Sequence, residues 1–95
     1  MTLLALGINH RTASVAVREQ VAFTPTQLES ALAELRGLPH IHEAAVLSTC
    51  NRTELYCVTD AAGEQTVLDW LGRFHNLRVD DLARCAYHYH DNEAA

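Results

Sequence analysis

The stretch Ala44-Ala-Val-Leu-Ser-Thr-Cys-Asn-Arg-Thr-Glu-Leu-Tyr-Cys-Val58 decides the fold, because two apolar runs flank one polar block within it. The runs are Ala44–Leu47 and Leu55–Val58, and the block between them is Ser48–Glu54. Short apolar runs bounded by polar residues are typical of buried strands. The stretch therefore predicts two antiparallel neighbouring strands joined through the polar block.

A helix is predicted immediately upstream of this pair of strands. Thr24 suits the N-cap, Pro25 suits the first helical position, and Gln27 completes a capping box. Apolar residues then recur at helical spacing, and Gly37 provides a stop. We expect the helix to end near Arg36.

The N-terminal part is predicted to hold one strand and one short helix. Thr2–Ile8 is apolar and is followed by a polar turn, which indicates a buried first strand. Ser14–Val21 predicts a short helix, although Val15 and Val17 also alternate as they would in a strand.

Two helices and a closing strand are expected downstream, over Gln65–Phe74, Asp80–Cys85 and Tyr87–His90. The resulting order is strand, two helices, two strands, two helices and strand. This order predicts an α+β domain of ferredoxin-like plan, with a four-stranded antiparallel sheet and helices on one face. Residues 1–95 are expected to form this single domain.

Composition indicates an ordinary globular domain, with 48% hydrophobic and 20% charged residues. The apolar runs are far shorter than the roughly 20 residues that span a bilayer, so no membrane segment is expected. The start has no basic region of a signal peptide, and the three cysteines form no disulfide framework, which together predict a cytoplasmic protein. The net charge of −5 disfavours nonspecific binding of nucleic acid.

The polar block places the thiol of Cys50 among hydroxyl, amide and guanidinium groups. Such convergence suits a reactive cysteine, but the spacing alone slightly favours a structural cysteine whose neighbours satisfy turn amides. The local pattern leaves both interpretations open.

Two motifs resemble those of glutamyl-tRNA reductases. Ser48–Glu54 is similar to the family's cysteine motif, and Gly7–Ala13 is similar to its N-terminal motif, at a matching separation. The resemblance extends over all 95 residues and identifies the chain with the N-terminal catalytic domain of this family. It implies an NADPH-dependent oxidoreductase that converts glutamyl-tRNA to glutamate-1-semialdehyde through a cysteine thioester, in tetrapyrrole (porphyrin, haem) biosynthesis.

The resemblance also implies roles for residues of the polar block. Cys50 is the expected nucleophile, since a thiolate converts the aminoacyl ester into a more electrophilic thioester. Thr49 and Asn51 are implied substrate ligands, although either could simply cap the turn. Arg52 suits the glutamate carboxylate, because its planar fork can bind both oxygens.

Asn9, His10 and Thr12 follow the first strand, which would be central in a ferredoxin-like sheet, and so are possible active-site lining residues. Two of them have structural alternatives. His10 could be a satisfied turn histidine, and Thr12 could cap the short helix that follows.

Other parts of the implied enzyme are expected outside this chain. It contains no Gly-x-Gly-x-x-Gly, so NADPH would be bound by an absent domain. The family's helical dimerisation domain is also absent, which predicts a monomeric fragment of a homodimeric protein. The run Asp91-Asn-Glu-Ala94 ends near Ala95, before the family's histidine near the nucleophile. The implied partners are glutamyl-tRNA and glutamate-1-semialdehyde aminomutase.

A noncatalytic metal-, haem- or RNA-binding module is the alternative. His40-x-His42 and His88-x-His90 each place two imidazoles on one face of an extended segment, but no Cys-x-x-Cys accompanies them, and no metal site is expected. Aromatic residues make up only 6% and the charge is negative, which argues against a base-stacking RNA module.

Overall fold

The computed structural model describes residues 2–9, 11, 14–49, 51–60 and 62–90. Its elements follow the predicted order, with four strands and four helices: β1 (Thr2–Asn9), α1 (Val15–Val21), α2 (Pro25–Arg36), β2 (Ile41–Ser48), β3 (Arg52–Thr59), α3 (Gly63–His75), α4 (Val79–Cys85) and β4 (Tyr87–His90). Within this described part, no helix is long and apolar enough to cross a bilayer.

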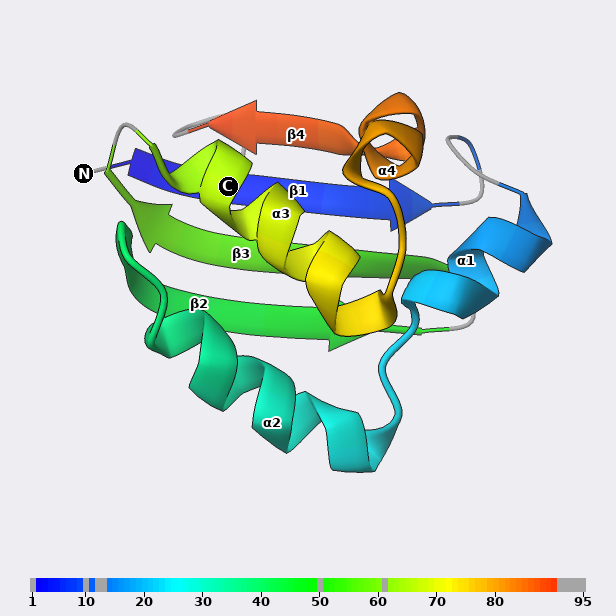
Figure 1. Cartoon of the computed structure of the whole chain (residues 1–95), viewed down its shortest axis with the longest axis horizontal. Coiled ribbons are helices and arrows are strands. Elements are labelled where there is room, and N and C mark those ends of the chain that lie inside the picture. The colour runs from blue at the N-terminus through cyan, green and yellow to red at the C-terminus, as the bar shows by residue number, and fades with distance from the viewer. Residues whose placement is uncertain (1, 10, 12–13, 50, 61, 91–95) are drawn as a thin grey trace.

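The four strands form one antiparallel sheet in the order β2-β3-β1-β4. The central pair β1 and β3 is aligned so that Gly7 lies opposite Glu54 and Asn9 lies opposite Arg52. Figure 1 shows α2 and α3 lying across the same face of the sheet. The α+β, ferredoxin-like prediction is therefore confirmed.

The core lies between this helix-bearing face and the helices. Alternate residues of β1 and β3, among them Leu4, Leu6 and Leu55, point into it, as a strand with two unlike faces requires. Phe23 stacks on Trp70 with ring centroids 6.1 Å apart, and the Trp70 indole nitrogen donates a hydrogen bond to Glu34 at 3.1 Å. The ring contact joins α3 to the segment before α2, and the hydrogen bond joins α3 to α2.

Helix α2 begins as its local sequence predicts. The Thr24 hydroxyl accepts a hydrogen bond from the Gln27 amide at 3.2 Å, and the Gln27 side chain accepts one from the Thr24 amide at 2.9 Å. This reciprocal capping box satisfies two amides that the helix itself leaves unpaired. The predicted end near Arg36 is also confirmed.

Two element ends are set by contacts that the sequence left open or did not reveal. The N-cap of α1 is Ser14, whose hydroxyl accepts from the Val17 amide at 3.4 Å. Thr12, for which capping of this helix was the alternative role, lies outside the described residues. The expected start of the third strand is wrong. Strand β3 begins at Arg52, three residues before the predicted Leu55. The polar residues there are held in the strand by pairing with β1, a long-range constraint that their own composition does not reveal.

Replacing Thr24 with alanine removes the capping hydroxyl of α2. We expect the free energy of unfolding to fall by about 1 kcal/mol, because an N-cap amide loses its acceptor. Chemical denaturation of the chain measures this change. Thr26→Ala, at an exposed position two residues further along the chain, is the matched control and should change stability by less than about 0.5 kcal/mol. Equal effects of the two substitutions would contradict the capping role.

Candidate active site

The connection between β2 and β3 is a tight turn built around the Thr49 side chain. The Thr49 hydroxyl accepts hydrogen bonds from the amides of Asn51 and Arg52, both at 3.2 Å, and the Thr49 amide donates to the Arg52 carbonyl at 2.8 Å. Cys50 is between Thr49 and Asn51 in sequence and lies outside the described residues. The turn-capping alternative for Thr49 is thus an observed role.

The base of this turn is anchored to the core side of the sheet. The Ser48 hydroxyl accepts a hydrogen bond from the Phe23 amide at 2.9 Å and lies 3.3 Å from the Thr53 hydroxyl. Thr53 is buried, and Phe23 belongs to the aromatic core. Two strands and the segment before α2 therefore fix the residues on either side of the turn.

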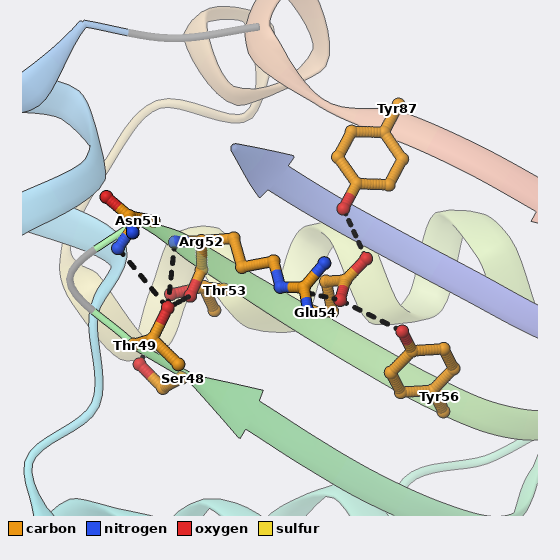
Figure 2. Close-up of polar contacts among 8 residues, drawn as sticks. All are labelled: Ser48, Thr49, Asn51, Arg52, Thr53, Glu54, Tyr56 and Tyr87. Atoms are coloured by element: carbon orange, nitrogen blue, oxygen red, sulfur yellow. Dashed lines mark hydrogen bonds and ion pairs between the residues drawn. The ribbon is translucent and has the colours of Figure 1, made fainter. Parts of the chain in front are cut away.

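The face of the sheet opposite the helices, called the open face below, carries a polar cluster. Arg52, Glu54 and Tyr56 alternate along β3 and so share this face. The Tyr56 hydroxyl donates to Glu54 Oε1 at 2.9 Å, the Tyr87 hydroxyl of β4 donates to Glu54 Oε2, and Arg52 Nε lies 3.5 Å from Oε1 (Figure 2). These four residues are called the Glu54 cluster.

The Glu54 side chain is 10% exposed, whereas that of Arg52 is 53% exposed. A carboxylate removed from water needs hydrogen-bond donors or a positive charge nearby. Tyr56 and Tyr87 supply two donors from opposite sides, and Arg52 supplies the charge. The cluster thus combines a buried, fixed carboxylate with an accessible guanidinium.

Gly7 makes the contact between β4 and β3 possible. Within the sheet Gly7 lies opposite both Glu54 and Tyr87, so the tyrosine must cross β1 to reach the carboxylate. A Cβ atom at Gly7 would lie 2.6 Å from the Tyr87 hydroxyl oxygen and 3.0 Å from Glu54 Cγ. Only glycine leaves this path open.

Burial raises the pKa of the Tyr87 hydroxyl, and the hydrogen bond to Glu54 raises it further. The same two causes raise the pKa of Tyr56. Both phenols therefore stay protonated at physiological pH and act as donors to Glu54. Both hydroxyl groups therefore remain available as hydrogen-bond donors at neutral pH.

Asn9 and Arg52 are brought together, since they lie opposite each other at the ends of β1 and β3. The Asn9 side-chain oxygen accepts from the Arg11 amide at 2.9 Å, and Asn9 also hydrogen-bonds Tyr87. The other two possible lining residues, His10 and Thr12, lie outside the described residues. Asn9 therefore joins the edge of the Glu54 cluster.

The two described cysteines differ in environment. Cys57 is 1% exposed within the core, and burial raises the pKa of its thiol to about 11. At neutral pH this leaves only about one molecule in ten thousand as thiolate, the form that attacks carbonyl groups. Cys85 lies partly buried at the end of α4. Cys57 is thus unsuited to nucleophilic chemistry.

Three of the four histidines considered as metal ligands, His40, His88 and His90, lie beside carboxylates. His40 Nδ1 lies 2.7 Å from Asp60, and this contact holds the pKa of the Asp60 carboxyl below its usual value. His88 and His90 lie 3.2 and 3.4 Å from the two oxygens of Glu64. Among the described residues, no group of three or more His, Cys, Asp or Glu is arranged to hold a metal ion.

The sequence predicted no role for Glu54, Tyr56 or Tyr87. A partial signal was present, since Arg52-x-Glu54-x-Tyr56 places three polar side chains on one strand face. The contribution of Tyr87 could not be found in this way, because it depends on the register of β4 against β1.

Comparison of the sequence with known proteins identifies a matching family. The family model described as "Glutamyl-tRNAGlu reductase, N-terminal domain" matches residues 6–95. The chain is 72% identical over 95 residues to the glutamyl-tRNA reductase of Chromohalobacter salexigens, and 54% identical over 94 residues to that of Pseudomonas aeruginosa. It is 47% identical over 95 residues to that of Photobacterium profundum. These matches cover 99 to 100% of this chain but only 22% of each relative.

Gly7→Ala should disrupt the crossing of Tyr87 over β1. We expect a loss of about 1 to 3 kcal/mol in the free energy of unfolding, because the new methyl group overlaps the phenol and separates it from Glu54. Denaturant titration of the chain measures it. Gly37→Ala is the matched control, since its Cβ would meet nothing closer than 3.6 Å and its φ is −86°. If both variants keep full stability, the close approach at Gly7 does not occur.

Proposed function

This chain belongs to the glutamyl-tRNA reductase N-terminal domain family, and from that premise we propose that it is the catalytic, glutamate-recognising domain of such an enzyme. The protein would reduce the glutamate of glutamyl-tRNA to glutamate-1-semialdehyde, in the tetrapyrrole pathway. The observation that carries the proposal is the family match over residues 6–95, which includes the turn with Cys50 and the exposed Arg52 beside it.

Cys50 is proposed as the nucleophile. Its thiolate attacks the ester carbonyl of the tRNA-bound glutamate, a carbon–sulfur bond forms, and the ester oxygen of the tRNA leaves and takes up a proton. The product is a protein thioester, which is more easily reduced than the oxygen ester. Support comes from the neighbours in sequence, because Thr49 and Asn51 are held in a tight turn, and from Cys57, which is buried and protonated.

Arg52 is proposed to bind the side-chain carboxylate of the glutamate. The residue begins β3, only two positions after Cys50, and about half of its side chain is exposed. A guanidinium offers paired N–H donors that match a carboxylate, whereas the amide of glutamine would lack the charge. Arg52 would therefore select glutamyl-tRNA over glutaminyl-tRNA.

Smaller roles are proposed for the residues around this pair. Asn51 can offer its side-chain amide to the substrate, and Thr49, whose hydroxyl serves two backbone amides, contributes mainly by shaping the turn. Asn9, His10 and Thr12 are proposed to line the site at the end of β1.

The remaining parts of the reaction are proposed to lie outside this chain, which spans 22% of the length of its relatives. Its 95 residues contain no Gly-x-Gly-x-x-Gly, so they do not fit a Rossmann pyrophosphate site, and NADPH would be held by another domain. Dimerisation of the full-length protein in the cytoplasm, and transfer of the product to glutamate-1-semialdehyde aminomutase, are likewise proposals.

The nucleophile can be tested by incubating the full-length protein with radiolabelled glutamyl-tRNA in the absence of NADPH. We expect label to become attached to the protein through a bond that hydroxylamine cleaves, as a thioester is cleaved. Cys50→Ser should carry no such label. Cys85→Ser, which removes the partly buried thiol at the end of α4, should behave as the unchanged protein does. An adduct that persists in Cys50→Ser but disappears in Cys85→Ser would overturn the assignment.

Arg52→Lys tests the carboxylate contact. We expect kcat/KM for glutamyl-tRNA to fall by the equivalent of about 1 to 3 kcal/mol, because a lysine keeps the charge but loses the paired donors. Arg73→Lys, at an exposed position in the last turn of α3, is the matched control. Steady-state kinetics of the full-length protein measures both, and an unchanged kcat/KM in Arg52→Lys would rule out this role.

A further inference from the structure

We propose that Glu54 is the positioning residue of the site: it holds the Nε edge of Arg52, so that the terminal guanidinium nitrogens are directed to the substrate carboxylate. This inference rests on the proposed function of Arg52. It assigns to Glu54, Tyr56 and Tyr87 a shared task that the motif alone does not reveal, namely to fix the orientation of one guanidinium (Figure 2).

The two members of the Arg52–Glu54 pair differ in exposure. Arg52 Nε lies 3.5 Å from Glu54 Oε1, while about half of the Arg52 side chain remains exposed. A guanidinium has five N–H donors in a rigid fork, and only one of them belongs to Nε. Engagement at Nε therefore orients the plane of the group and leaves the four terminal donors for a second carboxylate.

Glu54 itself is held from two sides. Tyr56, on the same strand, donates to Oε1, and Tyr87, on β4, donates to Oε2. Rotation of the carboxylate would break at least one of these bonds in a poorly solvated setting, where a lost hydrogen bond is costly. The partner of Arg52 is thus anchored from two strands of the sheet.

The negative charge of Glu54 also bears on how a substrate carboxylate can approach Arg52. A second carboxylate beside Glu54 would be repelled if the charge of Glu54 were uncompensated. Two phenol donors and the guanidinium stabilise that charge in place, and raised pKa values keep both phenols protonated. Glu54 can therefore orient Arg52 without competing for it.

Stability alone does not explain the arrangement of the Glu54 cluster. A partly exposed ion pair contributes little to folding, and a buried carboxylate costs desolvation. The cluster also requires a glycine at position 7, in the middle of a strand where glycine is unfavourable. Features that cost stability in several places at once are expected where a site must be held in one geometry.

The test measures formation of the hydroxylamine-sensitive adduct by full-length protein over a range of glutamyl-tRNA concentrations. For Glu54→Gln we expect the half-saturating concentration to rise about tenfold, with the maximal rate changed less than about threefold, because a misoriented Arg52 binds the carboxylate poorly while Cys50 is untouched. Glu43→Gln is the matched control on the open face, where residue 43 lies opposite Val58. Its half-saturating concentration should not change.

A double variant distinguishes the positioning of Arg52 by Glu54 from a general structural effect of the Glu54 substitution. In an Arg52→Met background, Glu54→Gln should add no further rise in half-saturating concentration, since the group to be oriented is gone. Tyr87→Phe, which keeps the ring but removes one donor to Glu54, should shift the same quantity in the same direction by a smaller factor. This second variant keeps the proposal testable if Glu54→Gln does not fold.

Three outcomes would overturn the inference. A half-saturating concentration equal to that of the unchanged protein would show that Glu54 does not act on binding, and a lower one would show that Glu54 competes with the substrate for Arg52. A full additional effect in the Arg52→Met background would show that Glu54 acts independently of Arg52. These results differ from failure of the proposed function itself, in which the unchanged protein would form no adduct.

Discussion

The hydrogen bond that Tyr87 donates to Glu54 across Gly7 is the constraint on which the open face of the sheet depends. It joins β4 to β3 over the backbone of β1, and it exists only in the register that sets Gly7 opposite both partners. A shift of one residue would move Glu54 to the apolar core face, where the carboxylate would have no donor. One buried carboxylate thus ties three strands to a single alignment, and Arg52 takes its position from that alignment.

The two faces of the sheet hold the β2–β3 turn in different ways. On the core side, Ser48 is bound by the Phe23 amide and lies against Thr53, so the base of the turn is fixed to the packed interior. On the open face, the Glu54 cluster fixes the side chain at the start of β3. A nucleophile in the turn and a carboxylate-binding group at its end would then be presented to one substrate at a constant separation, which is the geometric requirement of an acyl transfer between them.

The sequence correctly predicted those features of the fold that depend on interactions between residues close together in the chain. The α2 capping box and the order of elements followed from residues close together in the chain, such as Thr24 and Gln27, and the structure confirms them. The start of β3 at Arg52 and the Glu54 cluster could not be predicted, because both depend on pairing with strands about 30 to 45 residues away in sequence. The role of Arg52 in binding the glutamate carboxylate was inferred from its motif and chemistry and stays a prediction. The roles of Cys50, His10 and Thr12 are also predictions, and these three residues lie outside the described residues.

We propose that one substrate reaches both Cys50, through its ester carbonyl, and Arg52, through its side-chain carboxylate, while Glu54 holds Arg52 in place. A crystal structure of the full-length protein with a glutamyl-tRNA analogue, in which an amide replaces the reactive ester, tests it most directly. We expect the glutamate side-chain carboxylate to bind the terminal nitrogens of Arg52, while Nε of Arg52 still faces Glu54. The α-carbonyl carbon should lie about 3 to 3.5 Å from the Cys50 sulfur. A carboxylate bound elsewhere, or a Glu54 turned away from Arg52, would contradict it.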